Sequence, residues 1–269
     1  MIQFRQIVLL LFLGSLLFST EASALDNAID TSDPTRVYTG VGISAGSSEY
    51  VGGDSLQERR GIVSWAITAD DMLQIESGYG QHDSSVTGGD DSGLTRTSLR
   101  YRQRLPFDDA LQTGFLGMAF QAELQLSGEI RGTDGQTLFS GGTTPAIRIS
   151  KSFDIYPIVN LVNSFDKNFK HYNGSGFDFA PRLTYTPDYL WPGAVVQIQP
   201  GYSKYLVGQL AFGNASRMRI ASGGSLFSVL QWTLSAERCN GLDLTTWRGN
   251  NSTGLKHDWN ATFQLLGTF

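Results

Sequence analysis

Apolar and polar residues alternate with a period of two along most of the chain. In the run 58–69, for example, Val63, Trp65 and Ile67 share one parity and Arg60 lies on the other. This period places the apolar side chains on one face of a β-strand and the polar side chains on the opposite face. The pattern predicts twelve strands, at 36–46, 58–69, 72–82, 94–105, 113–126, 144–152, 155–166, 177–187, 194–204, 216–222, 226–237 and 255–269.

The predicted connections alternate in length along the chain. Those after even-numbered strands are short, and those after odd-numbered strands are longer and rich in Gly, Asp, Asn and Ser: 47–57, 83–93, 127–143, 167–176, 205–215 and 238–254. Short turns at one end and long loops at the other are typical of outer-membrane barrels. The sequence therefore predicts an all-β fold, an antiparallel up-and-down transmembrane β-barrel of about 12 strands. A soluble two-sheet sandwich is the alternative, because its core also needs an apolar strand face.

The first 24 residues have the pattern of a cleaved signal peptide. Arg5 precedes an apolar run over 7–18, and Ala22 and Ala24 form a cleavage site of small residues. The apolar run is shorter than the roughly 20 residues that a membrane-spanning helix needs. We therefore expect a signal peptide at 1–24, a short periplasmic tail at 25–35 and the barrel domain at 36–269.

Charged residues mark the face of the strands that is turned away from lipid. In the run 94–105, Arg96, Arg100, Arg102 and Arg104 alternate with apolar residues such as Leu99. Arginine facing lipid near the bilayer midplane costs about 2–4 kcal/mol, so these side chains are expected to face the lumen. The same parity predicts that the lumen is lined by Arg60, Glu76, Arg96, Arg100, Arg102, Arg104, Glu123, Arg148, Asp178, Arg182, Arg219 and Asp258, with Glu237 beside them.

Two interpretations of this lumen remain open. The excess of arginine favours a narrow passage for small anions or other polar solutes. Alternatively, Arg and Glu pair across neighbouring strands and fill a barrel with a structural role, and Glu76 and Glu123 are predicted to lie beside the arginine row.

Composition excludes some functions and offers no catalytic site. The net charge of −5 argues against nucleic acid as a partner, and Cys239 has no second cysteine with which to form a disulfide. His82 ends one predicted strand and is followed by Asp83 and Ser84, His171 lies in a loop that lacks the two-residue His–Ser spacing of outer-membrane phospholipases, and His257 precedes Asp258. A general base needs its nucleophile within hydrogen-bond reach, and we expect no such pair here. We therefore assign no catalytic residue, no metal and no cofactor.

The run 259–269 has one apolar face and an aromatic last residue. It resembles the closing strand of Gram-negative outer-membrane barrels, whose C-terminal signal is recognised by the barrel-assembly machinery; the residues that carry the likeness are Trp259, Phe263, Leu265 and Phe269. Together with the strand rhythm, the chain most resembles the solitary β-barrel domains of autotransporters, without a secreted passenger.

The resemblance implies a protein of the bacterial outer membrane with both termini in the periplasm and its outer face in contact with outer-membrane lipid. The function expected is non-enzymatic: a structural barrel, or a narrow porin-like channel with an arginine-rich lumen. An outer-membrane lipid hydrolase is one alternative. The other is a surface adhesin or ligand receptor that acts through the loops at 127–143 and 238–254.

Overall fold

In the described part of the chain, all regular structure is β-strand. The computed structural model describes residues 33–50, 53–83, 90–106, 114–130, 136–187, 193–208, 215–227, 229–240 and 257–269. Its strands are β1 (Gly40–Tyr50), β2 (Ser55–Ala66), β3 (Asp71–Asp83), β4 (Asp90–Pro106), β5 (Phe115–Leu126), β6 (Gln136–Ser150), β7 (Phe153–Tyr156), β8 (Val159–Asp166), β9 (Tyr172–Phe179), β10 (Arg182–Tyr185), β11 (Val195–Gly208), β12 (Ala215–Phe227), β13 (Leu230–Asn240) and β14 (His257–Thr268). Among the described residues, no helix has the length and apolar character needed to cross a membrane.

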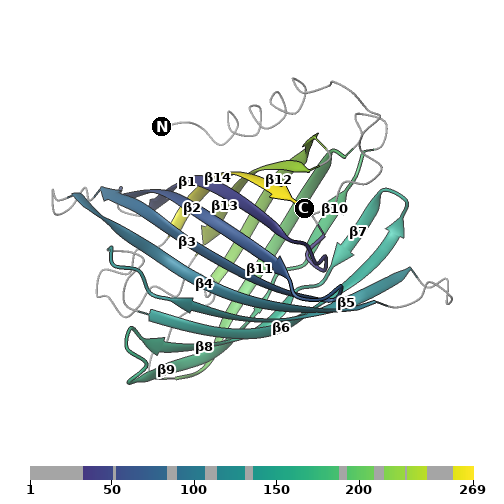
Figure 1. The fold of residues 1–269 in the computed structure, drawn as a ribbon. Helices are drawn as coiled ribbons and strands as arrows, with labels where there is room; N and C mark the ends of the chain where they lie inside the picture. The colour runs from purple at the N-terminus through teal and green to yellow at the C-terminus, as the bar shows by residue number, and fades with distance from the viewer. Residues whose placement is uncertain are drawn as a thin grey trace.

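The strands form one antiparallel sheet that closes on itself, because β1 pairs with both β2 and β14. The strands β7 and β8 both pair with β6, and β9 and β10 both pair with β11. Each couple is therefore a single wall strand that is interrupted once. Counted in this way, the described residues form a wall of twelve strands, which confirms the predicted transmembrane β-barrel. Figure 1 shows the wall closed into a barrel.

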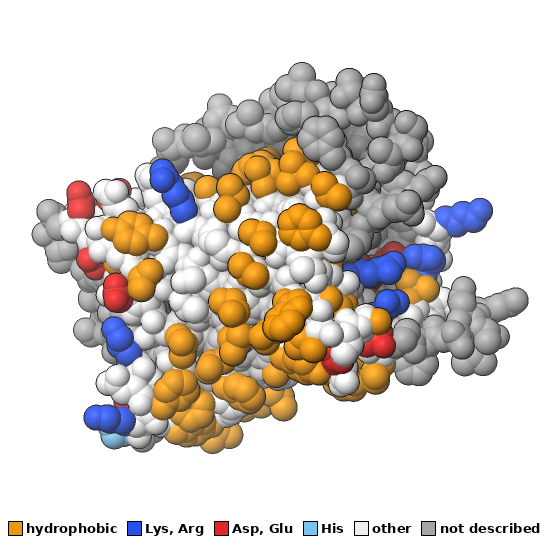
Figure 2. All heavy atoms as spheres, viewed as in Figure 1, with side chains coloured by type: hydrophobic (Ala, Val, Ile, Leu, Met, Phe, Trp, Pro, Cys, Tyr) orange, Lys and Arg blue, Asp and Glu red, His pale blue; other side chains and the backbone are white. Residues whose placement is uncertain are grey.

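Alternate side chains point to opposite sides of the wall. On β1, Ile43 is 64% exposed on the outer face, and its neighbour Ser44 is buried on the inner face. On β3, Met72 is fully buried inside, and Ile75 is exposed outside. Figure 2 shows apolar side chains spread over the outer wall, with charged residues gathered toward the two ends. An apolar belt of this kind would be unfavourable in water. It is favourable where the outer wall is in contact with lipid.

The segment before the first strand corrects one prediction, because β1 begins at Gly40 and not at residue 36. Asp33 accepts hydrogen bonds from the N–H and the Oγ1 of Thr35, at 2.8 and 2.7 Å, and this turn is buried. Farther along, Tyr38 packs against Met72 and Leu266. Residues 33–39 therefore form a terminal plug inside the end of the barrel where β1 begins and β14 ends. That end is called the terminal end, and the opposite one the loop end.

The predicted loops at the loop end are too long. β1 runs to Tyr50 and β2 starts at Ser55, although 47–57 was expected to be a loop, and β6 begins at Gln136 instead of residue 144. Residues such as Gln57 and Gln81 lie opposite each other in an intact ladder and are polar on the outer face. Beyond the lipid belt both faces of a strand meet water, so the apolar alternation stops while the hydrogen-bonded ladder continues. The strand predicted at 216–222 is likewise longer than expected, because β12 spans Ala215–Phe227.

Candidate functional site: the arginine-lined lumen

A cavity of about 410 Å³ lies within the barrel. Uncharged polar side chains from several strands line it, among them Ser44, Gln74 and Gln264, and Pro34 of the terminal plug also reaches it. Its charged lining residues are Glu58, Arg60, Glu76, Arg100, Arg102, Arg182, Arg219 and Glu237. The inner face of the wall therefore presents a polar cavity with arginines on opposite sides.

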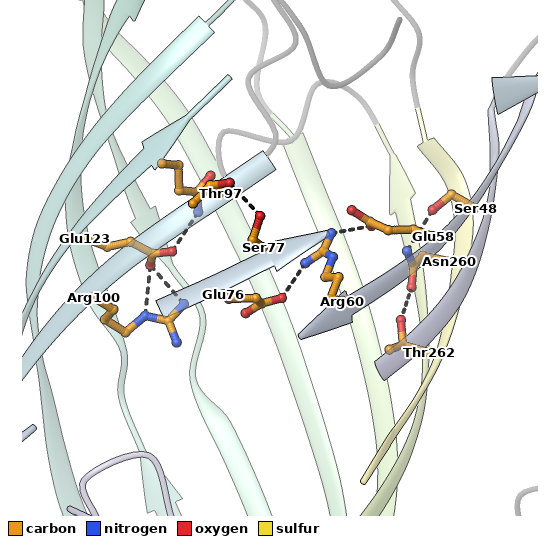
Figure 3. A network of polar contacts seen from close by, with 11 residues as sticks. Ser48, Glu58, Arg60, Glu76, Ser77, Thr97, Arg100, Glu123, Asn260 and Thr262 are labelled. Atoms are coloured by element: carbon orange, nitrogen blue, oxygen red, sulfur yellow. Dashed lines mark hydrogen bonds and ion pairs between the residues drawn. The ribbon is translucent and has the colours of Figure 1, made fainter. Parts of the chain in front are cut away.

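The first group of charges is neutralised within β2 and β3. Arg60 donates from Nη1 to Oε1 of Glu76 at 2.8 Å and from Nη2 to Oε2 of Glu58 at 2.6 Å, as Figure 3 shows. Gly78 lies directly opposite Arg60 in the ladder, and a Cβ there would come within 2.9 Å of the Arg60 Cγ. The glycine thus leaves the room in which the guanidinium can lie between the two carboxylates.

The second neutralised pair joins β4 to β5. Arg100 and Glu123 are direct partners in the ladder, and both Nε and Nη2 of Arg100 lie 3.0 Å from the same carboxylate oxygen, Oε2 (Figure 3). The other oxygen of Glu123 accepts a hydrogen bond from Gln125 at 3.0 Å. Charge-assisted contacts of this kind fix both side chains against the wall.

A third group of arginines has different partners. Arg102 is 7% exposed and donates from Nη1 to the Arg36 carbonyl of the terminal plug at 3.1 Å, while Arg219 donates from Nη2 to the hydroxyl of Ser235 at 3.4 Å. These two hydrogen bonds go to neutral oxygens, and Arg219 also lies opposite Glu237 in the β12–β13 ladder. Arg182, on β10, lines the same cavity as Arg102 and Arg219. Three guanidiniums from three separate strands therefore face one cavity, and their mutual repulsion favours a bound anion.

The structure places seven of the predicted lumen residues on the cavity. They are Arg60, Glu76, Arg100, Arg102, Arg182, Arg219 and Glu237. Glu123 forms an ion pair with Arg100. Arg96 lies beside a shift of register in the β3–β4 ladder. The Arg104 backbone N–H bonds the turn residue Asp70, at the terminal end. The side chain of Asp258 lies outside the described residues.

Two further predicted residues belong to ion pairs away from the cavity. Asp178 is 2% exposed and accepts hydrogen bonds from Ser203 at 2.6 Å and from Arg217 at 2.8 Å. Arg148 pairs with Asp154 at 3.1 Å, but half of its side chain is exposed. Asp178 is therefore a buried structural pair, and Arg148 lies on the rim.

Sequence reasoning missed Glu58 and Arg217 as inward-facing charges. Both share the parity of an arginine two residues away, Arg60 or Arg219, so the alternation itself held the signal. The terminal plug had no such signal, because a short turn leaves no periodic pattern.

Near the loop end, a small apolar cluster packs beside a buried histidine. Tyr50, Leu56 and Ile130 form a buried cluster, and Ile130 comes from the connection between β5 and β6. His82 is 1% exposed, with Nε2 3.6 Å from Oδ2 of the buried Asp54. His82 is therefore part of the packing at this end.

The other candidate residues have no shared site. The backbone carbonyl of His171 accepts a bond from Asp166 in the turn between β8 and β9, and the side chain of His257 lies outside the described residues. Within the described ranges, no cluster of three or more His, Cys, Asp or Glu side chains is positioned to hold a metal ion. Of the predicted assembly signal, Phe263 and Phe269 are exposed, and the Trp259 indole donates to Glu49. Its role in assembly stays a prediction.

Comparison with known proteins supports the fold. No protein-family model and no curated protein sequence matches the chain. Among solved structures, an outer-membrane channel from Pseudomonas putida F1 matches with a TM-score of 0.64 at 13% identity, covering 90% of this chain and 100% of that one. The NanC porin matches with a TM-score of 0.55 at 9% identity, covering 85% and 100%. The KdgM porin in complex with oligogalacturonate matches with a TM-score of 0.54 at 8% identity, covering 85% and 99%.

The chain thus has the fold of outer-membrane β-barrels. An autotransporter β-domain from Bordetella is also similar, so the resemblance to autotransporters is one among several within this class. At these identities the likeness concerns the fold alone.

Proposed function

We propose that this protein is a narrow channel of the bacterial outer membrane for small anions, with carboxylates as the expected class. The terminal end would face the periplasm, as expected from the signal-peptide pattern at 1–24 and from the arrangement of outer-membrane barrels inserted from that side. The function belongs to the lumen, not to an enzymatic centre. Channels and porins among the similar folds support this proposal without specifying a solute.

The observation that carries the proposal is the unequal treatment of the arginines. Arg60 and Arg100 are neutralised by carboxylates on adjacent strands, while Arg102, Arg182 and Arg219 converge on the cavity. A guanidinium presents a planar set of donors that matches a carboxylate, and rings of arginine favour anions in pores. A cavity of about 410 Å³ is large enough for a small organic anion.

The terminal plug and the loop-end cluster limit the width of the route. Arg102 holds the plug through the Arg36 carbonyl, and Ile130 packs against Tyr50 and Leu56 near the opposite end. We therefore expect a conductance smaller than that of a general porin, with the anion binding transiently in the cavity as it passes.

Planar-bilayer recording on the purified protein tests the proposal. Under a salt gradient, the reversal potential should show a preference for anions, and a triple variant R102Q/R182Q/R219Q should abolish that preference because the cavity loses its positive charge. The matched control is R148Q, which removes an arginine from the exposed rim and should leave the selectivity unchanged. A cation preference in the unmodified protein, or the absence of any conductance, would contradict the proposal.

The structural barrel, the lipid hydrolase and the surface receptor remain alternatives. A purely structural barrel would show no conductance in the same recording. A hydrolase needs an accessible general base, and His82 is buried against Asp54. A receptor would act through residues around 127–143 and 238–254, most of the second range lying outside the described residues.

A further inference from the structure

Four prolines lie side by side across four consecutive wall strands. Pro145 is on β6, Pro157 interrupts β7 and β8, Pro181 interrupts β9 and β10, and Pro200 is on β11. The ladder pairs on either side fix this register: Thr143–Val159 and Ile147–Ile155, then Val159–Phe179 and Tyr156–Arg182, then Phe179–Tyr202 and Leu183–Ile198. These four residues are called the proline row.

The row removes hydrogen bonds from both strands at the same places. The Ala180 N–H donates to the Ile158 carbonyl at 2.9 Å, so the backbone groups of these two residues point toward each other. Along each strand the next residue directs its backbone groups the opposite way, toward β6 for Pro157 and toward β11 for Pro181. Pro157 therefore faces Pro145, and Pro181 faces Pro200. Since proline has no N–H, neither member of either pair has a donor.

The ladders are interrupted at these two positions. The strand β6 pairs with β8 as far as Thr143–Val159 and resumes with β7, and β11 changes from β9 to β10 in the same way. Backbone carbonyls without partners are costly in lipid. The row has the same parity as the exposed Leu161 and Ile198, so the four prolines lie on the apolar outer face of the wall.

Behind the row, the inner face of the wall is apolar although most of the lumen is polar. Tyr156, Ile158 and Ala146 form a buried cluster, and Ala180 is buried next to Pro181. Tyr156 lies directly opposite Arg182, which lines the cavity. The proline row therefore has the outer face of the wall on one side, and on the inner side the apolar cluster lies next to Arg182.

We propose that the proline row is a lateral gate through which an amphipathic anion passes between the bilayer and the cavity. Its acidic group binds at Arg182 with Arg102 and Arg219, and its alkyl chain occupies the Tyr156 and Ile158 cluster and reaches the lipid through the row. The head-group half of this inference rests on the proposed anion cavity, whereas the seam in the wall stands on the register alone.

Photolabelling tests the gate. Proteoliposomes are irradiated with a diazirine derivative of dodecanoate, and the labelled residues are identified by mass spectrometry. Labels should concentrate on 155–158 and 180–183. The variant P145V/P157V/P181V/P200V restores the missing donors, so it should lower this labelling about tenfold, as closure by one or two backbone hydrogen bonds implies.

The matched control is P106V, which changes a strand proline opposite Gly117, outside the row. It should label like the unmodified protein. R182Q should also lower the labelling, because it removes the partner of the acidic group. Labels spread evenly over the outer wall, or labelling at 155–158 that the four valines leave unchanged, would overturn the gate.

A reversible closure covers the case in which the valine variant fails to fold. In a C239S background, T143C/V159C places two cysteines at partner positions of the β6–β8 ladder, at a separation that a disulfide can bridge. Oxidation should lower the labelling and reduction should restore it in the same sample. Chloride conductance, recorded in parallel, decides the channel separately: its absence would contradict the proposed function, and the labelling would still decide the gate.

Discussion

The wall formed by β2 to β5 differs from the wall formed by β6 to β11 in how it satisfies its polar groups. In the first, Arg60 and Arg100 form ion pairs with carboxylates of the same wall. The proline in these strands, Pro106, is the last residue of β4, at the terminal end. In the second, the proline row interrupts two ladders, and Arg182 faces the cavity. Both walls lie in the same bilayer, so the same cost of unpaired groups applies to each.

This difference distinguishes the groups that stabilise the barrel from the groups that are expected to serve transport. A charge or backbone group that is paired by its neighbours stiffens the barrel and has little capacity left for a ligand. The interrupted ladders of the proline row are retained against their cost, and they lie in the β6–β11 wall. The β6–β11 wall is therefore where lateral exchange is expected, and the paired charges of the β2–β5 wall are expected to hold the shape of the pore. Solute binding is expected between the walls, because Arg102 is on β4, Arg182 on β10 and Arg219 on β12.

The largest effect is expected at Asp178, because the β6–β11 wall also needs one structural ion pair. Asp178→Ala leaves Arg217 buried without its carboxylate and removes the acceptor of Ser203. Breaking a buried pair in this way typically costs about 3–5 kcal/mol of the free energy of unfolding. Urea unfolding in liposomes, followed by the shift in gel mobility between folded and unfolded barrel, measures the loss. S203A, which removes one hydrogen bond, should cost about 1 kcal/mol. Equal losses for the two variants would show that the ion pair is not the structural element.

A charge on the outer face of β1 should have the next largest effect. Ile43→Arg places a guanidinium at an exposed position of the apolar belt, with an expected cost of about 2–4 kcal/mol if it lies near the midplane. The same unfolding assay checks it. Gln57→Arg, on the outer face toward the loop end, is the control and should be nearly neutral. If both substitutions were tolerated equally, the outer face would not be in lipid and the comparison of the two walls would fail.

Restoring donors in the proline row should stabilise the barrel modestly. P145V/P157V supplies two N–H groups at one interrupted ladder position and should raise the free energy of unfolding by about 1–3 kcal/mol, the contribution of two backbone hydrogen bonds. P106V should change it less, because it alters a position at the end of a strand. A destabilised P145V/P157V variant with P106V unaffected would mean that the row is needed for the fold, not for opening.

The sequence predicted well which face of the wall a charged side chain lies on, and poorly which residue it pairs with. Alternation alone assigned Arg60, Arg100 and Arg182 to the lumen face, because a period of two leaves no other choice once one face lies in lipid. It did not reveal that Arg60 is neutralised twice while Arg182 faces the cavity. Partners depend on the register between strands, which the turns and strand lengths set, and no single strand encodes them.

The proline row shows the same limit. Each of Pro145, Pro157, Pro181 and Pro200 is an isolated proline in the sequence, at spacings without a period. Only the ladder pairs bring the four to one level. The terminal plug was missed for a related reason, because its position depends on a contact between Arg102 and the Arg36 carbonyl, which are far apart in the chain.

The smallest effect is expected for the ion pair on the rim of the β6–β11 wall. Asp154→Ala removes the carboxylate that lies 3.1 Å from Nε of Arg148, a side chain that is half exposed. Exposed ion pairs contribute about 0–1 kcal/mol to the free energy of unfolding, because water stabilises the separated charges almost as well as the ion pair does. The unfolding free energy should therefore stay within that range, and raising the salt concentration should shrink the difference further. A loss as large as that expected for Asp178→Ala would mean that burial does not distinguish the two pairs, and the separation of structural from functional charge in this wall would have to be redrawn.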